Sequence, residues 1–236
     1  MIGTWVNLAT VLVGGFLGLL LGNKIPERLR KTVIAGLGLF TIGLGLQFFL
    51  KTEQPLIPLG SLLVGGLLGE WWKIEEGLQW LGAWLERRFS PQHGNEEQQK
   101  FIRGFLTASL VFCVGPMAIM GSIQDGLNGE YQTLVVKAVL DGFAALAFAS
   151  SLGIGVLFSG LTVLIYQGAI TLLAAQLDAI VTPMMMNEMT AVGGLILIGI
   201  AISSLLELKP IRTASFLPAL LLAPLAAALL DLIGVL

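Results

Sequence analysis

Long apolar stretches alternate with short polar connections along most of the chain. A stretch of about 20 mostly apolar residues is long enough to cross a hydrocarbon core of roughly 30 Å as a helix. On this criterion the sequence predicts an all-α, polytopic membrane bundle of eight spanning helices, with seven as the alternative count, in a single domain over residues 1–236. The expected spans cover residues 3–22, 33–50, 56–72, 101–121, 133–151, 153–177, 189–206 and 216–235.

One long polar stretch, residues 72–100, separates three expected spans from five. Its first part has apolar residues at helical spacing, with charged residues and tryptophans beside them. This pattern predicts an amphipathic helix that lies in the cytoplasmic membrane interface. A break at residues 90–95 and a polar linker should follow it. The apolar positions of the expected helix are Trp71, Ile74, Leu78, Leu81 and Leu85.

Composition supports a membrane protein and excludes several other classes. Hydrophobic residues make up 56% of the chain and charged residues 12%, against roughly 25% charged residues in a soluble domain. This excludes a soluble globular enzyme, and it excludes disorder, which needs low hydrophobicity and high net charge. With a net charge of −2 and no basic block, the chain offers no surface for nucleic acid. Its single cysteine, Cys113, excludes an intrachain disulfide.

The basic residues predict an orientation in the membrane. Eleven of the 13 lysines and arginines lie in or beside odd-numbered connections, and only Lys51 and Lys137 fall outside this pattern. Because cytoplasmic loops carry an excess of Lys and Arg, the odd-numbered connections should be cytoplasmic. With eight spans, both termini then face outward.

A predicted helix break ends the fourth expected span. Pro116 follows Gly115, and Gly121 comes one turn later. A proline removes a backbone hydrogen bond and clashes with the preceding turn. In a membrane, the freed backbone groups persist only where protein buries them or where they line a wet cavity. Gln124 and Asp125 then place an amide and a carboxylate at the outer end, either in a site or in a solvated loop.

Two ionisable residues begin the fifth expected span. Lys137 and Asp141 are four residues apart, so they share a helix face and can pair. A charge at the bilayer centre costs roughly 2.5–3.5 kcal/mol, which makes intramembrane ionisable residues candidates for function. Asp141 is therefore the leading candidate. The alternative is an ion pair that only fixes helix packing.

Further candidates are Asn187 and Glu188 at the start of the seventh span and Gln167 within the sixth. Glu188 is equally explained as an acid that favours a helix N-terminus. Asn7 and Gln47, single amides in the first two spans, carry less weight. The only histidine, His93, lies in the polar linker, which disfavours an intramembrane hydrolase and leaves any metal site unassigned.

Glycine motifs recur in the apolar stretches. Leu12-Val13-Gly14-Gly15-Phe16-Leu17-Gly18 returns as Leu63-Val64-Gly65-Gly66-Leu67-Leu68-Gly69. Small residues of this kind let helices approach closely in a membrane, either within one chain or in a homodimer.

Several motifs together resemble one bacterial membrane family, the YqgA-like proteins catalogued as domain of unknown function 554. The resemblance extends over essentially the whole chain. It implies a multi-pass protein of the bacterial inner membrane, and it implies no established activity. The motifs are Gly3-Thr4-Trp5-Val6-Asn7, Lys24-Ile25-Pro26-Glu27-Arg28, residues 112–126 around Gly115-Pro116, Lys137-Ala138-Val139-Leu140-Asp141-Gly142 and residues 187–194.

Taken together, the polar residues within apolar spans favour a small transporter or permease for a cation or a proton-coupled small solute. Asp125, Asp141 and Glu188 would hold the cation or proton, because hard oxygen donors suit such ligands. Gln124, Gln167 and Asn187 would add neutral ligands, and Lys137 would be an internal counter-charge. The alternative is a non-transporting scaffold or regulatory subunit whose interfacial helix binds a partner. The expected partners are the lipid bilayer and, in a possible homodimer, a second copy of the chain. We expect neither an enzymatic activity nor a cofactor.

Overall fold

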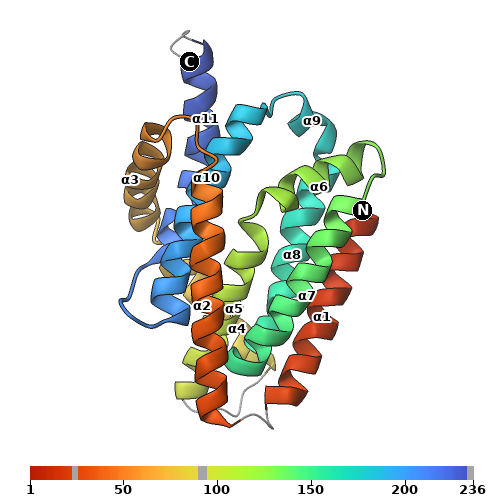
Figure 1. Cartoon of the computed structure of the whole chain (residues 1–236), viewed down its shortest axis with the longest axis vertical. Coiled ribbons are helices and arrows are strands. Elements are labelled where there is room, and N and C mark those ends of the chain that lie inside the picture. Colours follow the sequence, from red (N-terminus) through yellow and green to blue (C-terminus); the bar gives the residue numbers. More distant parts are fainter. Residues whose placement is uncertain (23–25, 90–94, 233–236) are drawn as a thin grey trace. The chain divides into compact units, whose positions relative to one another are not determined.

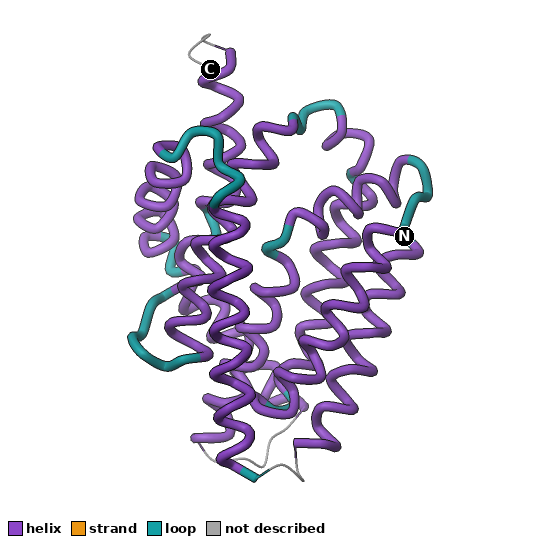
Figure 2. The backbone as a smooth tube through the Cα atoms, viewed as in Figure 1, coloured by secondary structure: helices purple, strands orange, loops and turns teal. Residues whose placement is uncertain are grey.

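The computed structural model describes residues 1–22, 26–89 and 95–232, and every regular element in this part of the chain is helical (Figure 2). The longer helices are separated by short connections (Figure 1). The elements are α1 (Ile2–Gly22), α2 (Glu27–Phe49), α3 (Leu56–Trp71), α4 (Ile74–Phe89), α5 (Asn95–Cys113), α6 (Pro116–Leu127), α7 (Gln132–Leu152), α8 (Gly155–Leu172), α9 (Ala174–Asp178), α10 (Pro183–Ile200), the π-helical turn η1 (Ala201–Leu205), the 3-10 turn η2 (Thr213–Phe216) and α11 (Ala219–Leu232).

The expected number of eight spans is not reached. Six described helical segments are long and apolar enough to cross a membrane, or seven if α5 and α6 form one bent span. The shortfall lies at the third expected span, because α3 has 16 residues. At 1.5 Å per residue such a helix is about 24 Å long, less than the roughly 30 Å of a hydrocarbon core. Both the all-helical class and the alternative count of seven agree with the structure.

The fourth expected span is broken where Gly115 and Pro116 predict it. α5 ends at Cys113, α6 begins at Pro116, and their axes differ by 61°. Gly115 has an extended backbone, with φ −103° and ψ 147°, so Pro116 begins a new helix and does not kink an existing one. This position suits proline, because the first residue of a helix needs no N–H donor.

The fifth and sixth expected spans form two separate helices, α7 and α8. Gly153 ends α7 with φ +82°, a conformation that costs a glycine little and other residues much. The expected sixth span, residues 153–177, is divided again: α8 ends at Leu172 and the short α9 follows.

The polar stretch is more helical than expected. α4 forms the predicted amphipathic helix, and Lys73, with φ 54°, separates it from α3. Trp80 and Trp84 are exposed, while Leu85 packs against aromatic residues of α5. The expected linker up to residue 100 is too long, because α5 already begins at Asn95, where Glu96 and Glu97 favour a helix start.

Some predictions fall outside the described residues. These are most of the break at residues 90–95 with His93, the Lys24–Ile25 part of the family motif, and the end of the last expected span.

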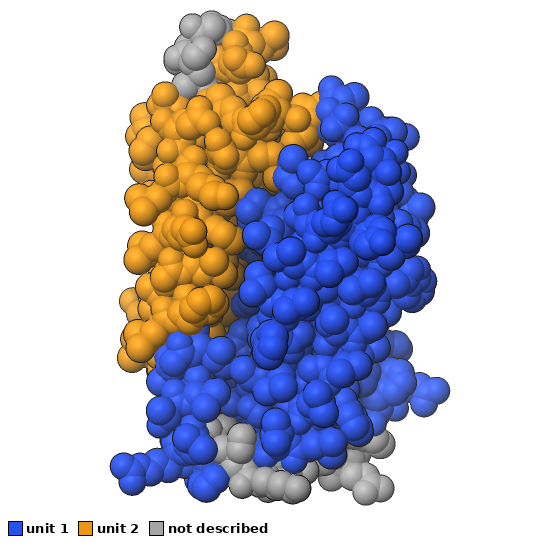
Figure 3. Space-filling view, turned by 45° about the vertical axis from the view of Figure 1, so that its right-hand side comes forward, with its two compact units in different colours: residues 1–37, 79–179 blue, residues 38–78, 180–236 orange. Residues whose placement is uncertain are grey.

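Contacts divide the chain into two compact units (Figure 3). Unit 1 comprises residues 1–37 and 79–179, and unit 2 comprises residues 38–78 and 180–236. In unit 1, α1 lies along α7 and also packs against α8, while α8 contacts α5 and α6. In unit 2, α11 packs against α3 and α10. The prediction of a single domain stays a prediction.

The recurring glycine motifs serve close helix packing, as the sequence predicts. In α1, a Cβ at Gly14 would collide with the carbonyl oxygen of Gly142 in α7. In α3, a Cβ at Gly65 would lie 2.5 Å from the backbone nitrogen of Ala219 in α11. The fourth residue after each glycine, Gly18 or Gly69, meets the backbone of the partner segment in the same way. Both repeats therefore use a Gly-x-x-x-Gly face to bring two backbones together.

Candidate functional site

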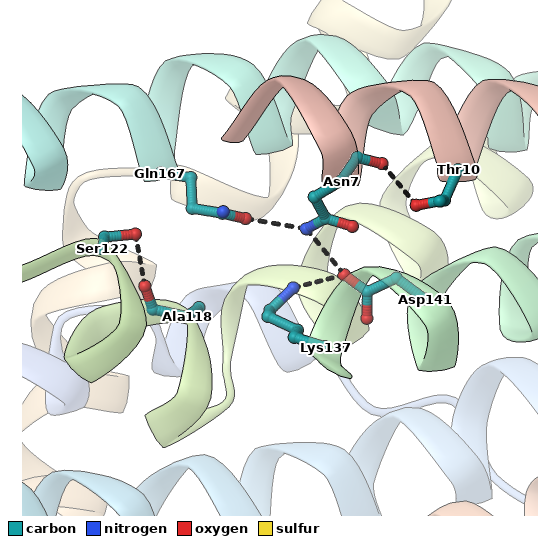
Figure 4. A network of polar contacts seen from close by, with 7 residues as sticks. All are labelled: Asn7, Thr10, Ala118, Ser122, Lys137, Asp141 and Gln167. Carbon is teal, nitrogen blue, oxygen red and sulfur yellow. Dashed lines mark hydrogen bonds and ion pairs between the residues drawn. The ribbon is translucent and has the colours of Figure 1, made fainter. Parts of the chain in front are cut away.

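Four polar side chains meet in the interior of unit 1, and we call them the Asp141 cluster: Asn7, Lys137, Asp141 and Gln167 (Figure 4). The Nδ2 of Asn7 donates to Asp141 Oδ2 at 3.0 Å and to Gln167 Oε1 at 2.7 Å. The Lys137 ammonium pairs with the same Asp141 oxygen, which confirms the pairing expected from the spacing. One amide thus joins α1 to both α7 and α8.

Helical spacing brings these side chains together. The buried face of α1 contains Asn7, Val11, Gly14 and Gly18, which recur every three to four residues. Because the two glycines let α1 approach the backbone of α7, the short Asn7 side chain reaches Asp141.

The cluster is buried but balanced in charge. Asn7 is 0% exposed, Gln167 1%, Lys137 5% and Asp141 9%. Removing an ion from water costs several kcal/mol, and an ion pair recovers this only with good geometry and further hydrogen bonds. Asp141 has such a further hydrogen bond, since the oxygen that pairs with the ammonium also accepts from an amide. The positive charge of Lys137 offsets the negative charge of Asp141.

The break between α5 and α6 lies beside the Asp141 cluster. Cys113, the last residue of α5, is within electrostatic range of Lys137 and Asp141. The close view shows the α6 turn with Ala118 and Ser122 beside this group (Figure 4). The interrupted backbone and the buried polar side chains therefore occupy the same part of unit 1.

Asp125 and Gln124, at the end of α6, have partners of their own. Asp125 Oδ2 accepts from the backbone N–H of Gly3 at 3.1 Å, and Oδ1 pairs with the amino group of Met1 at 3.1 Å. Gln124 Oε1 accepts from the hydroxyl of Thr133 in α7 at 2.8 Å. Asp125 thus holds the first turn of α1 and is itself buried.

Glu188 and Asn187 form a second polar group, which lies in unit 2. The buried Glu188 carboxylate accepts from the hydroxyl of Thr52 at 2.7 Å and from the backbone N–H groups of Glu53 and Gln54 at 2.8 and 3.1 Å. Asn187 Nδ2 donates to Glu53 Oε1 at 2.7 Å. These contacts attach the connection between α2 and α3 to α10.

The seven residues expected to line one path therefore do not form one hydrogen-bonded group. Asp141, Lys137 and Gln167 share the Asp141 cluster, Asp125 and Gln124 bind their own partners in unit 1, and Asn187 and Glu188 belong to unit 2. That these groups serve one path stays a prediction.

Sequence reasoning gave too little weight to Asn7, which supplies the central hydrogen bonds of the Asp141 cluster. The available signal was a carboxamide seven residues before a Gly-x-x-x-Gly face in an otherwise apolar helix. Within residues 1–22, 26–89 and 95–232, no group of three or more His, Cys, Asp and Glu side chains is arranged to hold a metal ion.

Residues 2–228 match the model of a family described as "Protein of unknown function (DUF554)". The chain is 35% identical over 229 residues to "Uncharacterized protein YqgA" of Escherichia coli (strain K12), covering 96% of this chain and 97% of that protein. It is 27% identical over 238 residues to "Uncharacterized membrane protein YdfK" of Bacillus subtilis (strain 168), covering 99% of each. No solved structure matches. The resemblance drawn from the sequence motifs is confirmed.

Proposed function

The chain belongs to the DUF554 family of multi-pass membrane proteins, and we propose that it is a small transporter in the bacterial inner membrane. Its substrate is a cation or a proton-coupled small solute. The observation that supports this function best is the Asp141 cluster. An ion pair and two carboxamides are buried between helices that are otherwise apolar, where polar groups are costly.

The chemistry of the cluster suits a cation or a proton. Carboxylate and carboxamide oxygens are hard donors. Lys137 and an external cation compete for Asp141, because both need its negative charge. Protonation or cation binding at Asp141 frees the Lys137 ammonium, and loss of that ligand restores the ion pair. The empty pair is net neutral, and the loaded state carries the charge of the bound proton or cation.

The break at Gly115 and Pro116 supplies the second part of the proposal. Two helix ends meet beside the cluster, and a helix end has backbone groups without intrahelical partners. Such groups at membrane depth persist where they face protein or water. A change in the angle between α5 and α6 would expose the cluster to one side of the membrane at a time.

Flux measurements in liposomes test the proposed function. Purified protein is reconstituted with a trapped pH dye or a trapped cation-sensitive dye, and protons, monovalent cations and divalent cations are applied in turn. The wild type should produce flux with at least one cation, and Asp141→Asn should abolish it. The matched control is Asp178→Asn, a change of the same kind at an exposed position ending α9. Folded wild-type protein that moves none of these ions contradicts a cation or proton transporter.

The outward face of α4 favours the second candidate, a scaffold or regulatory subunit. Trp80 and Trp84 are exposed on this helix. In a transporter these rings lie among lipid headgroups, as amphipathic interfacial helices do. In a scaffold they contact a partner protein instead. A scaffold carries no flux, so the liposome measurement separates the two functions.

We also propose that the odd-numbered connections are cytoplasmic. Eight spans, with both termini outside, require that α3 crosses the membrane and that α5 and α6 make one further span. Seven spans place the termini on opposite sides. Tags at the two termini, exposed to protease from one side of sealed vesicles, distinguish these topologies.

A further inference from the structure

The start of α1 connects two buried carboxylates. The Gly3 backbone N–H donates to Asp125 on α6, and the Asn7 side chain donates to Asp141 on α7. Gly3, Thr4 and Asn7 all belong to the buried face of α1. Four residues of helix rise about 6 Å, so a little over one turn of α1 separates these two attachment points.

Three polar atoms in this region have no hydrogen-bond partner among the described residues: Thr4 Oγ1, Asn7 Oδ1 and Gln167 Nε2. Buried polar atoms are normally satisfied. Some other buried hydroxyls of unit 1 are satisfied within their own helix, as Ser122 is by the Ala118 carbonyl and Thr171 by the Gln167 carbonyl, whereas Thr107 Oγ1 in α5 also has no partner among the described residues. Three of the unsatisfied atoms therefore lie at the Asp141 cluster or one turn of α1 away from Asn7.

The three atoms are chemically complementary to water. Asn7 Oδ1 needs a donor, Gln167 Nε2 needs an acceptor, and the Thr4 hydroxyl can do either. A water molecule donates and accepts at once, and buried water typically makes two to four hydrogen bonds to such groups.

We propose that the buried face of α1 holds a hydrogen-bonded water chain that carries protons between Asp125 and Asp141, with Thr4, Asn7 and Gln167 as the residues that position the water. This inference rests on the proposed function, because it makes the proton the coupling ion. Each step breaks one O–H bond as the next forms, so the chain returns to its starting composition after a proton has passed.

The charged and titratable groups around the two carboxylates fit such a relay. Asp141 faces Lys137 on its own helix and Cys113 at the end of α5, and Asp125 faces the amino group of Met1. A proton that arrives at Asp141 weakens the ion pair with Lys137. Thr4 carries no charge, so its hydroxyl tests the relay without altering these ion pairs.

Substitutions of Thr4 test the proposal in the full chain. Thr4→Val and Thr4→Ala remove the hydroxyl with and without a matched volume, and Thr4→Ser keeps it. The control is Thr190→Val, because Thr190 is also buried but donates to the Met186 carbonyl of its own helix at 2.6 Å. Proton movement is followed with a pH dye trapped in liposomes. It is driven by an imposed potassium potential, in the presence of each cation that gave flux with the wild type.

The relay predicts that Thr4→Val and Thr4→Ala slow proton movement by about tenfold or more, since positioned proton transfer contributes at least that much. Thr4→Ser and Thr190→Val should stay close to the wild-type rate. If Thr4→Val does not fold, Thr4→Ala decides, because it adds no bulk. Proton movement at the wild-type rate without the hydroxyl overturns the relay and leaves the transporter standing. A wild type without any flux overturns the proposed function itself.

Discussion

The Asn7 carboxamide on α1 donates to the Asp141 carboxylate on α7 at 3.0 Å, across 134 positions of sequence. The same nitrogen donates to Gln167 on α8. Asn7 therefore unites three helices of unit 1 at the point where an ion pair is buried. This relationship makes the stability of the unit and the chemistry of its interior depend on the same side chain.

Replacing Asn7 should destabilise the protein. Asn7→Leu leaves Gln167 Oε1 without its donor and removes one of two donors to Asp141. A buried polar group that loses its partner costs about 1–3 kcal/mol. The control is Gln47→Leu, an exposed amide on α2, which should change stability by no more than about 0.5 kcal/mol. Unfolding in detergent measures the loss of stability in each variant. Equal losses in Asn7→Leu and Gln47→Leu would contradict a hydrogen-bonding role for Asn7.

The buried ion pair predicts a strong non-additivity. Lys137→Met or Asp141→Leu alone strands one charge and should cost about 3–5 kcal/mol. The double variant leaves no stranded charge and should cost less than either single change. A double-mutant cycle measures the coupling energy. Additive losses would show that the two residues act independently.

The glycine contacts predict opposite effects of one substitution at two sites. Gly14→Ala places a methyl group against the Gly142 carbonyl of α7 and should destabilise by about 1–3 kcal/mol. Gly43→Ala, on α2, meets nothing within 4 Å. It should be neutral or stabilise by about 0.5–1 kcal/mol, because alanine favours helix more than glycine does. Thermal midpoints compare the two, and destabilisation at Gly43 would indicate a packing partner there.

The ion pair between Glu76 on α4 and Arg212, which precedes η2, predicts that the thermal stability depends on pH. A backbone hydrogen bond and the Arg212 guanidinium hold the pKa of Glu76 below its ordinary value of 4.5. A carboxyl group with a lowered folded-state pKa stabilises the fold above its unfolded pKa, and the effect is lost as the pH falls through the folded pKa. Glu76→Gln should therefore flatten the fall of the thermal midpoint between about pH 5 and pH 3. Glu130→Gln, at an exposed turn, should leave that curve unchanged.

Glu188 should act on the connection between α2 and α3. Glu188→Gln replaces a carboxylate that accepts three hydrogen bonds and should make residues 50–55 more sensitive to protease. Glu53→Gln, in the same exposed turn, is the comparison and should have a smaller effect. If Glu188→Gln abolishes flux while the protease pattern is unchanged, Glu188 belongs to the transport path as the sequence suggests.

Local features of the sequence predicted much of this structure. The i, i+4 spacing of Lys137 and Asp141 gave their pairing, and Gly115-Pro116 gave the helix break. The count of eight failed at α3, although its bounds were predicted to within one residue: with 16 residues the helix is about 24 Å long, shorter than a hydrocarbon core of roughly 30 Å.

The partners of the candidate residues were not predictable from local pattern. Asn7 meets Asp141, and Glu188 meets Thr52, only because helices far apart in sequence pack together. Spacing along one helix says which residues share a face, and it does not say which other helix that face meets. Asp125, expected in a site or a solvated loop, instead binds the first turn of α1.

The central claim, that the Asp141 cluster opens to water, can be tested through Cys113. This is the sole cysteine of the chain, it precedes the break, and it lies within electrostatic range of Lys137 and Asp141. The measurement is labelling of folded protein in liposomes by a charged, membrane-impermeant methanethiosulfonate, with Cys113→Ser as the blank. An opening cluster predicts steady labelling that a transported cation slows. Labelling that appears only after unfolding would contradict the claim and leave the cluster as a packing device.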